Sequence, residues 1–293
     1  MSLENQIRAI ARDLLETKQV QCMIGYEIGS HGRVRPAFIY DPAEVERLVW
    51  NQACTHNLVG YLHDKNKPLK KGEVPPRVGI VVKPCDSRGI NVLLAENQIQ
   101  RQQIYVIGVT CEGVLEGAGF CNPQTGNLQS RCQRCTERIP VVYDALLGEA
   151  PRLEAGGDAY EDIAQLEAMS PQERLSFWMR QYDRCIRCYA CRQVCPACYC
   201  SVCMFERDDS LWVGIASGLK EKEFFHLGRA YHLAGRCVGC NECERVCPMD
   251  LPISLLNRKL AKEMQELFDY RAGMKPEKAP LVTMLAEGEE SLI

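Results

Sequence analysis

RCIRCYACRQVCP is the sequence of residues 184–196, and RCVGCNECERVCP is the sequence of residues 236–248. Each segment has four cysteines at the spacing C-x-x-C-x-x-C-x-x-x-C, and proline follows the last one directly. Each also has arginine before its first cysteine and valine before its last. The same pattern therefore occurs twice, and we expect the two copies to form one small structural module.

This spacing is that of two-cluster ferredoxins, which bind 4Fe-4S cubes. Three cysteines two residues apart can hold one side of a cube, and the fourth lies too far along the chain to reach the same cube, so it ligates the other one. The proline prevents the chain from continuing as a helix into the space of the cluster. We therefore expect two 4Fe-4S clusters with crossed ligands. The expected ligands are Cys185, Cys188, Cys191 and Cys247 for cluster one, and Cys237, Cys240, Cys243 and Cys195 for cluster two.

Paired structural zinc sites are the alternative, because C-x-x-C is also a zinc-binding spacing. Zinc sites usually place two such pairs apart in the chain, and they rarely use three cysteines at this pitch followed by Cys-Pro. The pattern therefore favours iron–sulfur clusters at these eight positions.

Composition narrows the class of protein. A chain of 293 residues is long enough for two domains, and its 46% apolar and 25% charged residues are ordinary for a globular protein. A net charge of -3 argues against nucleic-acid binding. The 18 cysteines are accompanied by neither a secretory signal nor an apolar run of membrane-spanning length. We therefore expect a cytoplasmic protein without direct membrane insertion, whose reduced thiols bind metal.

The N-terminal part alternates between helix and strand patterns, which is typical of an α/β domain. The elements expected there are a helix over 3–18, strands over 20–28 and 34–40, and a βαβ unit with strands over 77–82 and 104–109 around a helix over 90–98. Ser170, Pro171 and Glu173 form a capping-box signal for a later helix. A long amphipathic helix is expected over 253–270, with Gly273 ending it.

The expected fold class is an α/β N-terminal domain followed by an α+β two-cluster ferredoxin-like domain with a long C-terminal helix. The predicted bounds are 1–150 for the α/β domain with a cysteine-rich metal loop, 151–183 for a linker and helix, 184–273 for the two-cluster domain with an insertion at 196–236, and 274–293 for an extended C-terminal arm.

A third metal site is predicted in the α/β domain. Sites of parallel sheets lie in loops at the carboxyl ends of the strands, where Cys85 and Cys111 follow the two strands of the βαβ unit. Residues 111–135 have few apolar side chains that could form a core, and metal ligation would give the segment a defined structure. Zinc or a flexible group of thiols is the alternative to iron–sulfur here. The candidate ligands of a third 4Fe-4S cluster are Cys111, Cys121, Cys132 and Cys135, with Cys85 competing with Cys121 for one corner.

Five cysteines remain outside these sets. Cys22 and Cys54 are interpreted as small buried hydrophobic residues. Cys198, Cys200 and Cys203 follow the first run closely, and either they supply extra ligands or they are buried shielding residues around cluster one.

Beyond the spacing, the cysteine runs resemble a known group of proteins. RCIRCYACRQVCPACYCSVC and HLAGRCVGCNECERVCPMDLPISLLNRKL, followed by LFDYRAG, make 182–273 similar to iron–sulfur subunits that accompany heterodisulfide reductase. They are also similar to those of soluble formate dehydrogenases and flavin oxidoreductases of anaerobes. Residues 77–145 resemble the beta subunit of deazaflavin-reducing (coenzyme F-type) hydrogenases and formate dehydrogenases.

The second resemblance is carried by Lys83-Pro84-Cys85-Asp86, Gly108-Val109-Thr110-Cys111 and Cys132-x-x-Cys135. In that family such cysteines hold a 4Fe-4S cluster beside FAD. The resemblance therefore implies FAD as a cofactor, and Cys121 becomes the alternative ligand. The ligands that it implies are Cys85, Cys111, Cys132 and Cys135.

The sequence has no G-x-G-x-x-G motif, no Walker loop and no recognisable nucleophile with its base, so no catalytic residue is predicted. We expect an electron-transfer subunit of an anaerobic oxidoreductase complex, which relays single electrons from a partner's flavin or metal centre to a second partner. The expected partners are a flavoprotein, a dehydrogenase or hydrogenase, and a heterodisulfide reductase-like subunit. The alternative is a flavin-containing catalytic subunit that reduces a deazaflavin or nicotinamide coenzyme.

Overall fold

The structure is a computed structural model that describes residues 1–65, 76–116, 126–149, 151, 159–207, 209 and 214–280. The chain divides into two compact units. The first, here called the sheet unit, comprises Met1–Ala159 with Gly273–Glu277. The second, the helical unit, comprises Tyr160–Ala272 with Lys278–Ile293. Residues 152–158 of the predicted linker segment lie outside the described residues, as do residues 281–293 of the predicted C-terminal arm.

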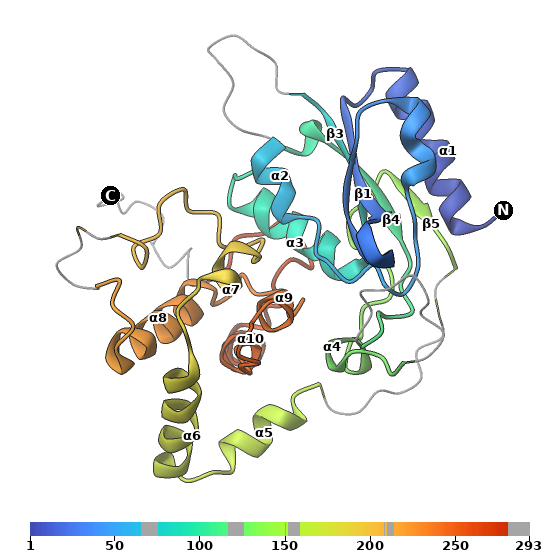
Figure 1. Ribbon diagram of the computed structural model, residues 1–293. Helices are drawn as coiled ribbons and strands as arrows, with labels where there is room; N and C mark the ends of the chain where they lie inside the picture. Colours follow the sequence, from blue (N-terminus) through green and yellow to red (C-terminus); the bar gives the residue numbers. More distant parts are fainter. Residues whose placement is uncertain are drawn as a thin grey trace, which may run out of the picture. The chain divides into compact units, whose positions relative to one another are not determined.

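A five-stranded sheet forms the framework of the sheet unit (Figure 1). The strand order is β2-β1-β3-β4-β5, with β1 antiparallel to β2 and all other neighbours parallel. The α/β class of this part and the predicted βαβ unit are confirmed, but the helix of the unit spans Pro84–Ala95 instead of 90–98, because Pro84 begins it directly after β3. The strands are β1 (Cys22–Ile28), β2 (Val34–Ile39), β3 (Val78–Val82), β4 (Ile104–Val109) and β5 (Ala145–Leu147).

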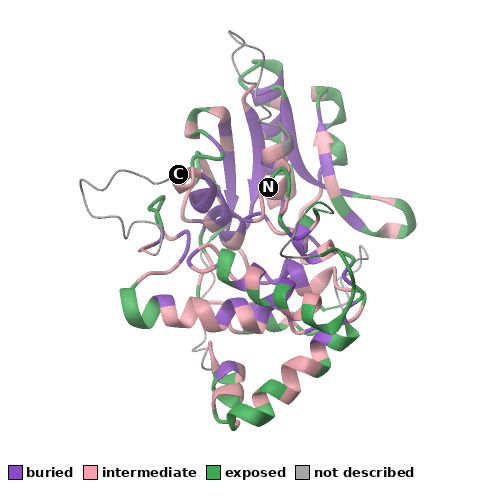
Figure 2. Cartoon of the chain, turned by 90° about the vertical axis from the view of Figure 1, so that its left-hand side faces the viewer, coloured by how far each residue is buried: buried purple, intermediate pink, exposed green. Residues whose placement is uncertain are grey.

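Helices cover both faces of this sheet. Figure 1 shows α1 (Leu3–Glu16) on one side and α3 (Pro84–Ala95) on the other, and the strands between them are largely buried (Figure 2). The buried side chains of α1 pack against alternate strand residues such as Met23, Val81 and Ile107. Because strand side chains alternate between faces, the intervening residues are free to face α3. The shorter elements of the unit are α2 (Gly60–Lys65), α4 (Ser130–Gln133) and the 3₁₀ turns η1 (Ser30–Gly32), η2 (Pro42–Arg47) and η3 (Arg101–Gln103).

The helical unit consists of helices and loops, and its described residues contain no strand. The α+β content expected for this part is therefore not found there. The physical reason is that the cysteine loops turn through left-handed backbone conformations, which an extended strand does not allow. The helices are α5 (Glu161–Glu167), α6 (Pro171–Arg184), α7 (Ala190–Gln193), α8 (Leu219–His232), α9 (Glu242–Arg245) and α10 (Ser254–Phe268).

Two of these helices have an end that was predicted from the sequence. The capping box of α6 is confirmed, because the Glu173 amide donates to Ser170 Oγ at 3.3 Å and the Ser170 amide donates to Glu173 Oε2 at 2.8 Å. The end of α10 was predicted wrongly. Asp269, with φ 49°, closes the helix in place of Gly273, since aspartate is one of the few residues that adopt this left-handed conformation readily.

None of the described helices combines the length and the apolar character that crossing a lipid bilayer requires.

Candidate iron–sulfur centres

The two cysteine runs fold into loops with the same backbone. In each run a loop leads into a one-turn helix, α7 or α9, which carries the third cysteine. The second residue after the first cysteine is left-handed in both copies, with φ 55° at Arg187 and 72° at Gly239. So is the fourth, with φ 59° at Tyr189 and 50° at Asn241. The repeat in the sequence is therefore a repeat in the structure.

The structure groups the cysteines across the two runs. The last cysteine of the second run, Cys247, lies with the first three of the first run, and their pocket is closed by apolar and aromatic side chains such as Phe225 and Leu251. Burial, opposed by the charge of Arg229 and aided by the other three thiols of the set, raises the pKa of the Cys191 thiol to about 11. The cysteines that line this pocket are Cys185, Cys188, Cys191 and Cys247.

The remaining four cysteines of the runs also lie together. Burial raises the pKa of both Cys240 and Cys243, and the nearby Cys195 and Cys237 raise both values further. Cys195 belongs to the first run and the other three belong to the second. The grouping is thus reciprocal, because each run places its last cysteine with the first three of the other.

Backbone amides point at several of these sulfur atoms. The amide two residues after a cysteine donates to its Sγ at Cys185, where the N···S distance is 3.3 Å, and equivalent bonds reach Cys195 from Ala197 and Cys240 from Glu242. A sulfur that accepts amide hydrogen bonds is stabilised as the thiolate, the form that binds metal. The donor set and its backbone therefore fit a pair of thiolate-ligated clusters.

The described cysteine groups are not arranged like the ligands of a single metal ion. None of the described cysteines takes part in a disulfide. Over the described ranges, no group of three or more His, Cys, Asp or Glu side chains is arranged to hold a metal ion. The four ligands of a 4Fe-4S cube bind four different iron atoms, so their sulfur atoms do not need to converge on one point.

A third group of thiols lies at the carboxyl ends of β3 and β4. The pKa of Cys111 is raised to about 11, and burial is the largest cause. The Gly113 amide and the charge of Lys83 lower this pKa, whereas the nearby Cys132 and Cys135 thiols raise it. Burial likewise raises the pKa of Cys85, and Cys111 is among the charges that act on it. Gly113 donates its amide to Cys111 Sγ, and Val114 to Cys132 Sγ, both at 3.3 Å. Four predicted ligands are thus neighbours, and Cys121 lies outside the described residues.

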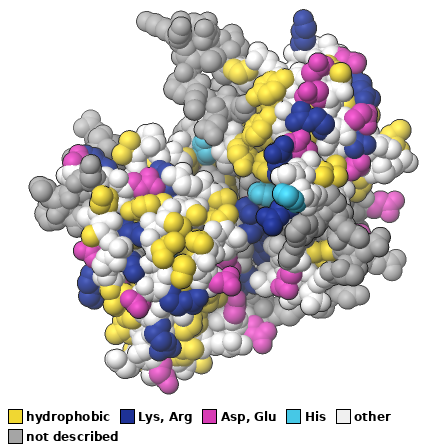
Figure 3. Space-filling model, in the orientation of Figure 1, with side chains coloured by type: hydrophobic (Ala, Val, Ile, Leu, Met, Phe, Trp, Pro, Cys, Tyr) yellow, Lys and Arg dark blue, Asp and Glu magenta, His cyan; other side chains and the backbone are white. Residues whose placement is uncertain are grey.

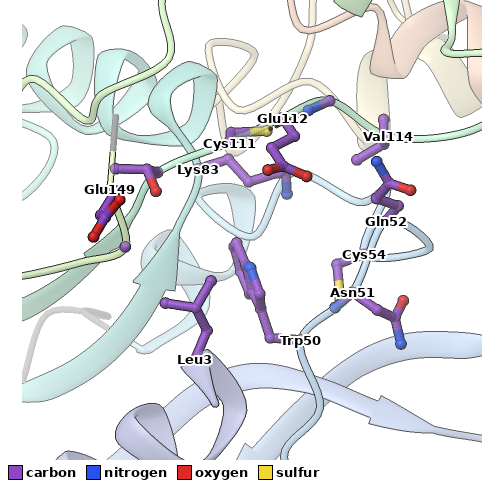
Figure 4. A pocket seen from close by; sticks show the side chains of 13 residues that line it. Leu3, Trp50, Asn51, Gln52, Cys54, Lys83, Cys111, Glu112, Val114 and Glu149 are labelled. Atoms are coloured by element: carbon purple, nitrogen blue, oxygen red, sulfur yellow. Dashed lines mark hydrogen bonds between the residues drawn. The ribbon is translucent and has the colours of Figure 1, made fainter. Parts of the chain in front are cut away.

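Beside this group is a cavity of about 340 Å³. Figure 4 shows Trp50 in its middle, with Lys83 and Cys111 at one end and Leu3 at the other. Lys83 is 3% exposed, and its ammonium forms an ion pair with Asp86 at 2.9 Å. It also donates to the His56 carbonyl at 2.7 Å and to the Tyr26 hydroxyl. This network fixes the loop that leads into Cys85.

The other described cysteines differ from one another in burial and in their contacts. Cys22 and Cys54 are 2% and 1% exposed, as expected for small hydrophobic residues. Cys198 donates a hydrogen bond to Cys195, Cys203 packs against the hydrophobic core of the unit, and Cys200 is exposed. Cys198 and Cys203 therefore lie near the cluster loops, whereas Cys200 does not act as a buried shield.

Three buried residues beside the cysteine loops were not predicted from the sequence. Arg187 and Arg229, 5% and 3% exposed, and the buried His226 surround the cysteine loops, and the last two lie on α8 in the insertion. Arginine and histidine on an amphipathic helix read as solvent-facing residues. Only the three-dimensional arrangement shows that these are buried beside the thiols.

Part of the chain matches a known protein family. A model of the 4Fe-4S dicluster domain matches residues 181–251. The chain therefore contains a two-cluster iron–sulfur domain, and it is an iron–sulfur electron-transfer protein.

Two relatives are beta subunits of F420-dependent formate dehydrogenases. The subunit from Methanocaldococcus jannaschii is 23% identical over 362 residues, covering 94% of this chain and 93% of the relative. The formate dehydrogenase 1 subunit beta from Methanococcus maripaludis is 23% identical, covering 70% of this chain and 75% of the relative. A third relative is acetyl-CoA decarbonylase/synthase complex subunit alpha 1 from Methanosarcina acetivorans, 29% identical over 43% of this chain and 13% of its own length. The chain is thus similar to the Methanocaldococcus jannaschii beta subunit over nearly its whole length.

Proposed function

We propose that the chain is the electron-transfer subunit of a multi-subunit oxidoreductase of anaerobic metabolism. The observation that carries the proposal is the crossed grouping of eight cysteines in the helical unit. When bound, each cluster would supply one-electron transfer. The chain's own part is to hold the clusters close together in a buried setting. The proposed ligands are Cys185, Cys188, Cys191 and Cys247 for cluster one, and Cys237, Cys240, Cys243 and Cys195 for cluster two.

A third 4Fe-4S cluster in the sheet unit is part of the proposal. Its support is the mutual proximity of four thiols and the two amides that donate to Cys111 and Cys132. Cys121 is retained as the alternative to Cys85 at one corner. The proposed ligands are Cys85, Cys111, Cys132 and Cys135.

The proposed partners are other subunits of a redox complex in the cytoplasm. Two of the relatives are subunits of F420-dependent formate dehydrogenases. We therefore propose a dehydrogenase or hydrogenase subunit, or a flavoprotein, as electron donor, and a heterodisulfide reductase-like subunit as a second partner. Hydrophobic side chains gather on the surface of the helical unit in the view of Figure 3. Exposed apolar residues include Ile186 in the first cysteine loop and Phe224 and Tyr231 on α8. Such surfaces favour contact with another protein.

A specific observation favours a second candidate function, that of a flavin-bearing catalytic subunit. The cavity of about 340 Å³ has the size of a cofactor site, and the proposed third cluster adjoins it through Cys111. Trp50 offers a flat aromatic face for a ring system, and Lys83 offers a buried positive charge. In this case FAD or a deazaflavin would bind in the sheet unit.

Anaerobic purification of the chain with its partners tests both candidates. About eight irons per chain are expected for two clusters and about twelve for three. Identification of the co-purifying subunits would name the donor and acceptor. A yellow chromophore released on denaturation supports the catalytic candidate, and a colourless supernatant contradicts it. Zinc in place of iron, or only about four irons, contradicts the paired-cluster proposal.

A further inference from the structure

Helix α8 brings one buried arginine to both cysteine groups. The helix lies in the insertion at 196–236, which separates the two cysteine runs. Arg229, in its last turn, is 3% exposed. Its Nη2 donates to the Cys191 carbonyl oxygen at 3.0 Å, so it contacts the loop of cluster one.

The same guanidinium group reaches the second set of thiols. It hydrogen-bonds the side chain of Cys195, a proposed ligand of cluster two, and that of the neighbouring Cys198. Cys243, another proposed ligand of cluster two, lies within range of the same positive charge. Arg229 is thus a side chain of the insertion that acts on the ligand sets of both proposed clusters.

The positive charges of nearby arginines are balanced by carboxylates or by backbone carbonyl groups. Arg192 pairs with Glu206 at 3.3 Å, and Arg245 pairs with Glu242 at 2.7 Å. Arg187 donates to the carbonyl oxygens of the loop and insertion. Within the part of the chain that the structure describes, no carboxylate forms an ion pair with Arg229, and its buried Nε has no hydrogen-bond partner.

His226, which lies three residues before Arg229 on α8 and is also buried, carries no charge near neutral pH. Burial, followed by the charges of Arg229 and Arg187, lowers the pKa of His226 to about 4. A buried guanidinium without a carboxylate is costly unless another negative charge lies nearby. The thiolates of the two ligand sets are the groups that can provide it, and arginine keeps its own charge at all relevant pH values.

We propose that Arg229 is a potential-tuning residue, whose fixed positive charge between the two ligand sets raises the reduction potentials of both clusters. The inference rests on the proposed function, since it requires both clusters to be bound. Reduction adds negative charge to a cluster, and a positive charge held in a low-dielectric interior stabilises that state. Net charge and hydrogen bonds to sulfur are among the factors that set the potential of such clusters. The effect is expected to be larger for cluster two, because Arg229 hydrogen-bonds the Cys195 side chain there but the Cys191 carbonyl oxygen at cluster one.

The test is a redox titration of the whole protein, followed by electron paramagnetic resonance, for three variants. Arg229→Gln removes the positive charge. Arg229→Lys keeps the charge but lacks the planar guanidinium group and its set of N–H donors. Lys220→Gln is the matched control, because it removes the same charge from the same helix at a side chain that is 82% exposed. We expect Arg229→Gln to shift both midpoints to more negative values, Arg229→Lys to stay nearer the unmodified protein, and Lys220→Gln to change neither, since solvent screens its charge.

Iron content decides between this inference and the proposed function. If the unmodified protein holds no paired clusters, the proposed function itself fails. If it does, and Arg229→Gln keeps its iron with unshifted midpoints, only the tuning role is overturned. Loss of a cluster from both Arg229 variants would likewise overturn it, because Arg229 would then be needed to hold the cluster.

Discussion

Cys247 lies in the same pocket as Cys185, although the two residues belong to different copies of the cysteine run. The pairing explains why the runs fold as one module. A loop that lends its last ligand to its neighbour cannot complete a site alone. Each proposed cluster therefore acts as a crosslink between segments that the insertion separates.

This crossing can be tested by combining cysteine substitutions. Cys247→Ala is expected to lower the iron content by about four atoms per chain, because cluster one loses a ligand. Adding Cys185→Ala should cause little further loss, since the same cluster is affected. Adding Cys237→Ala instead should remove about four more irons. Iron analysis and resonance spectra of the three proteins provide the measurement, and an uncrossed module would give the reverse result for the two double variants.

Two exposed cysteines provide a matched comparison for ligation. Cys188 and Cys200 are both exposed, but only Cys188 is a proposed ligand. Iodoacetamide under anaerobic conditions is expected to label Cys200 and to leave Cys188 unmodified in the iron-loaded protein. After removal of iron both should react, as peptide mass spectrometry would show. Rapid labelling of Cys188 in the loaded protein would rule it out as a ligand.

The third cluster is tested by a similar pair in the sheet unit. Cys111→Ala should lower the iron content by about four atoms while the spectra of the other two clusters persist. Cys54→Ala is the control, because Cys54 lines the same cavity but is buried as a neutral thiol, with burial raising its pKa to about 12. Equal iron in both variants would contradict the third cluster. Cys85→Ala and Cys121→Ala, compared in the same way, distinguish the two candidates for the remaining corner.

Two left-handed glycines should differ in their tolerance of a side chain. Gly273, with φ 73°, would place a Cβ atom 2.1 Å from the Arg88 carbonyl oxygen, whereas Gly239, with φ 72°, has nothing within 4 Å. Gly239→Ala should cost about 1–2 kcal/mol of stability from backbone strain alone. Gly273→Ala should cost clearly more, because the clash with the backbone of α3 adds to the strain.

Thermal unfolding midpoints of the iron-loaded variants compare these costs. Asparagine tolerates the left-handed conformation, as Asn241 does in the equivalent loop. Gly239→Asn should therefore recover most of the loss, and Gly273→Asn should not. Similar midpoints for the two alanine variants would show that the crowding at Gly273 relaxes easily.

The sequence predicted the features that depend on local spacing. The βαβ unit of the sheet and the capping box at Ser170 are set by apolar periodicity and by neighbouring side chains, and both were found. The end of α10 was missed because glycine is the stronger stop signal, yet Asp269 comes first and can adopt the same conformation.

Long-range relationships within the sites could not be predicted in the same way. The buried Lys83–Asp86 pair is held by the Tyr26 hydroxyl and the His56 carbonyl, and both come from other parts of the chain. The position of Arg229 depends on how α8 packs inside the insertion. Charged residues are rarely buried, so a lysine or arginine in the sequence is expected to face solvent until the packing is known.

The reciprocal grouping of the cysteines also has a consequence for synthesis of the protein. A ribosome releases Cys185, Cys188 and Cys191 long before Cys247, and Cys195 before any cysteine of the second run. For the two proposed clusters of the helical unit, the nascent chain therefore presents no complete set of four thiols until translation has passed the insertion. Iron delivery to these two clusters must wait for that moment, and a message truncated before it would yield a polypeptide that retains neither of them.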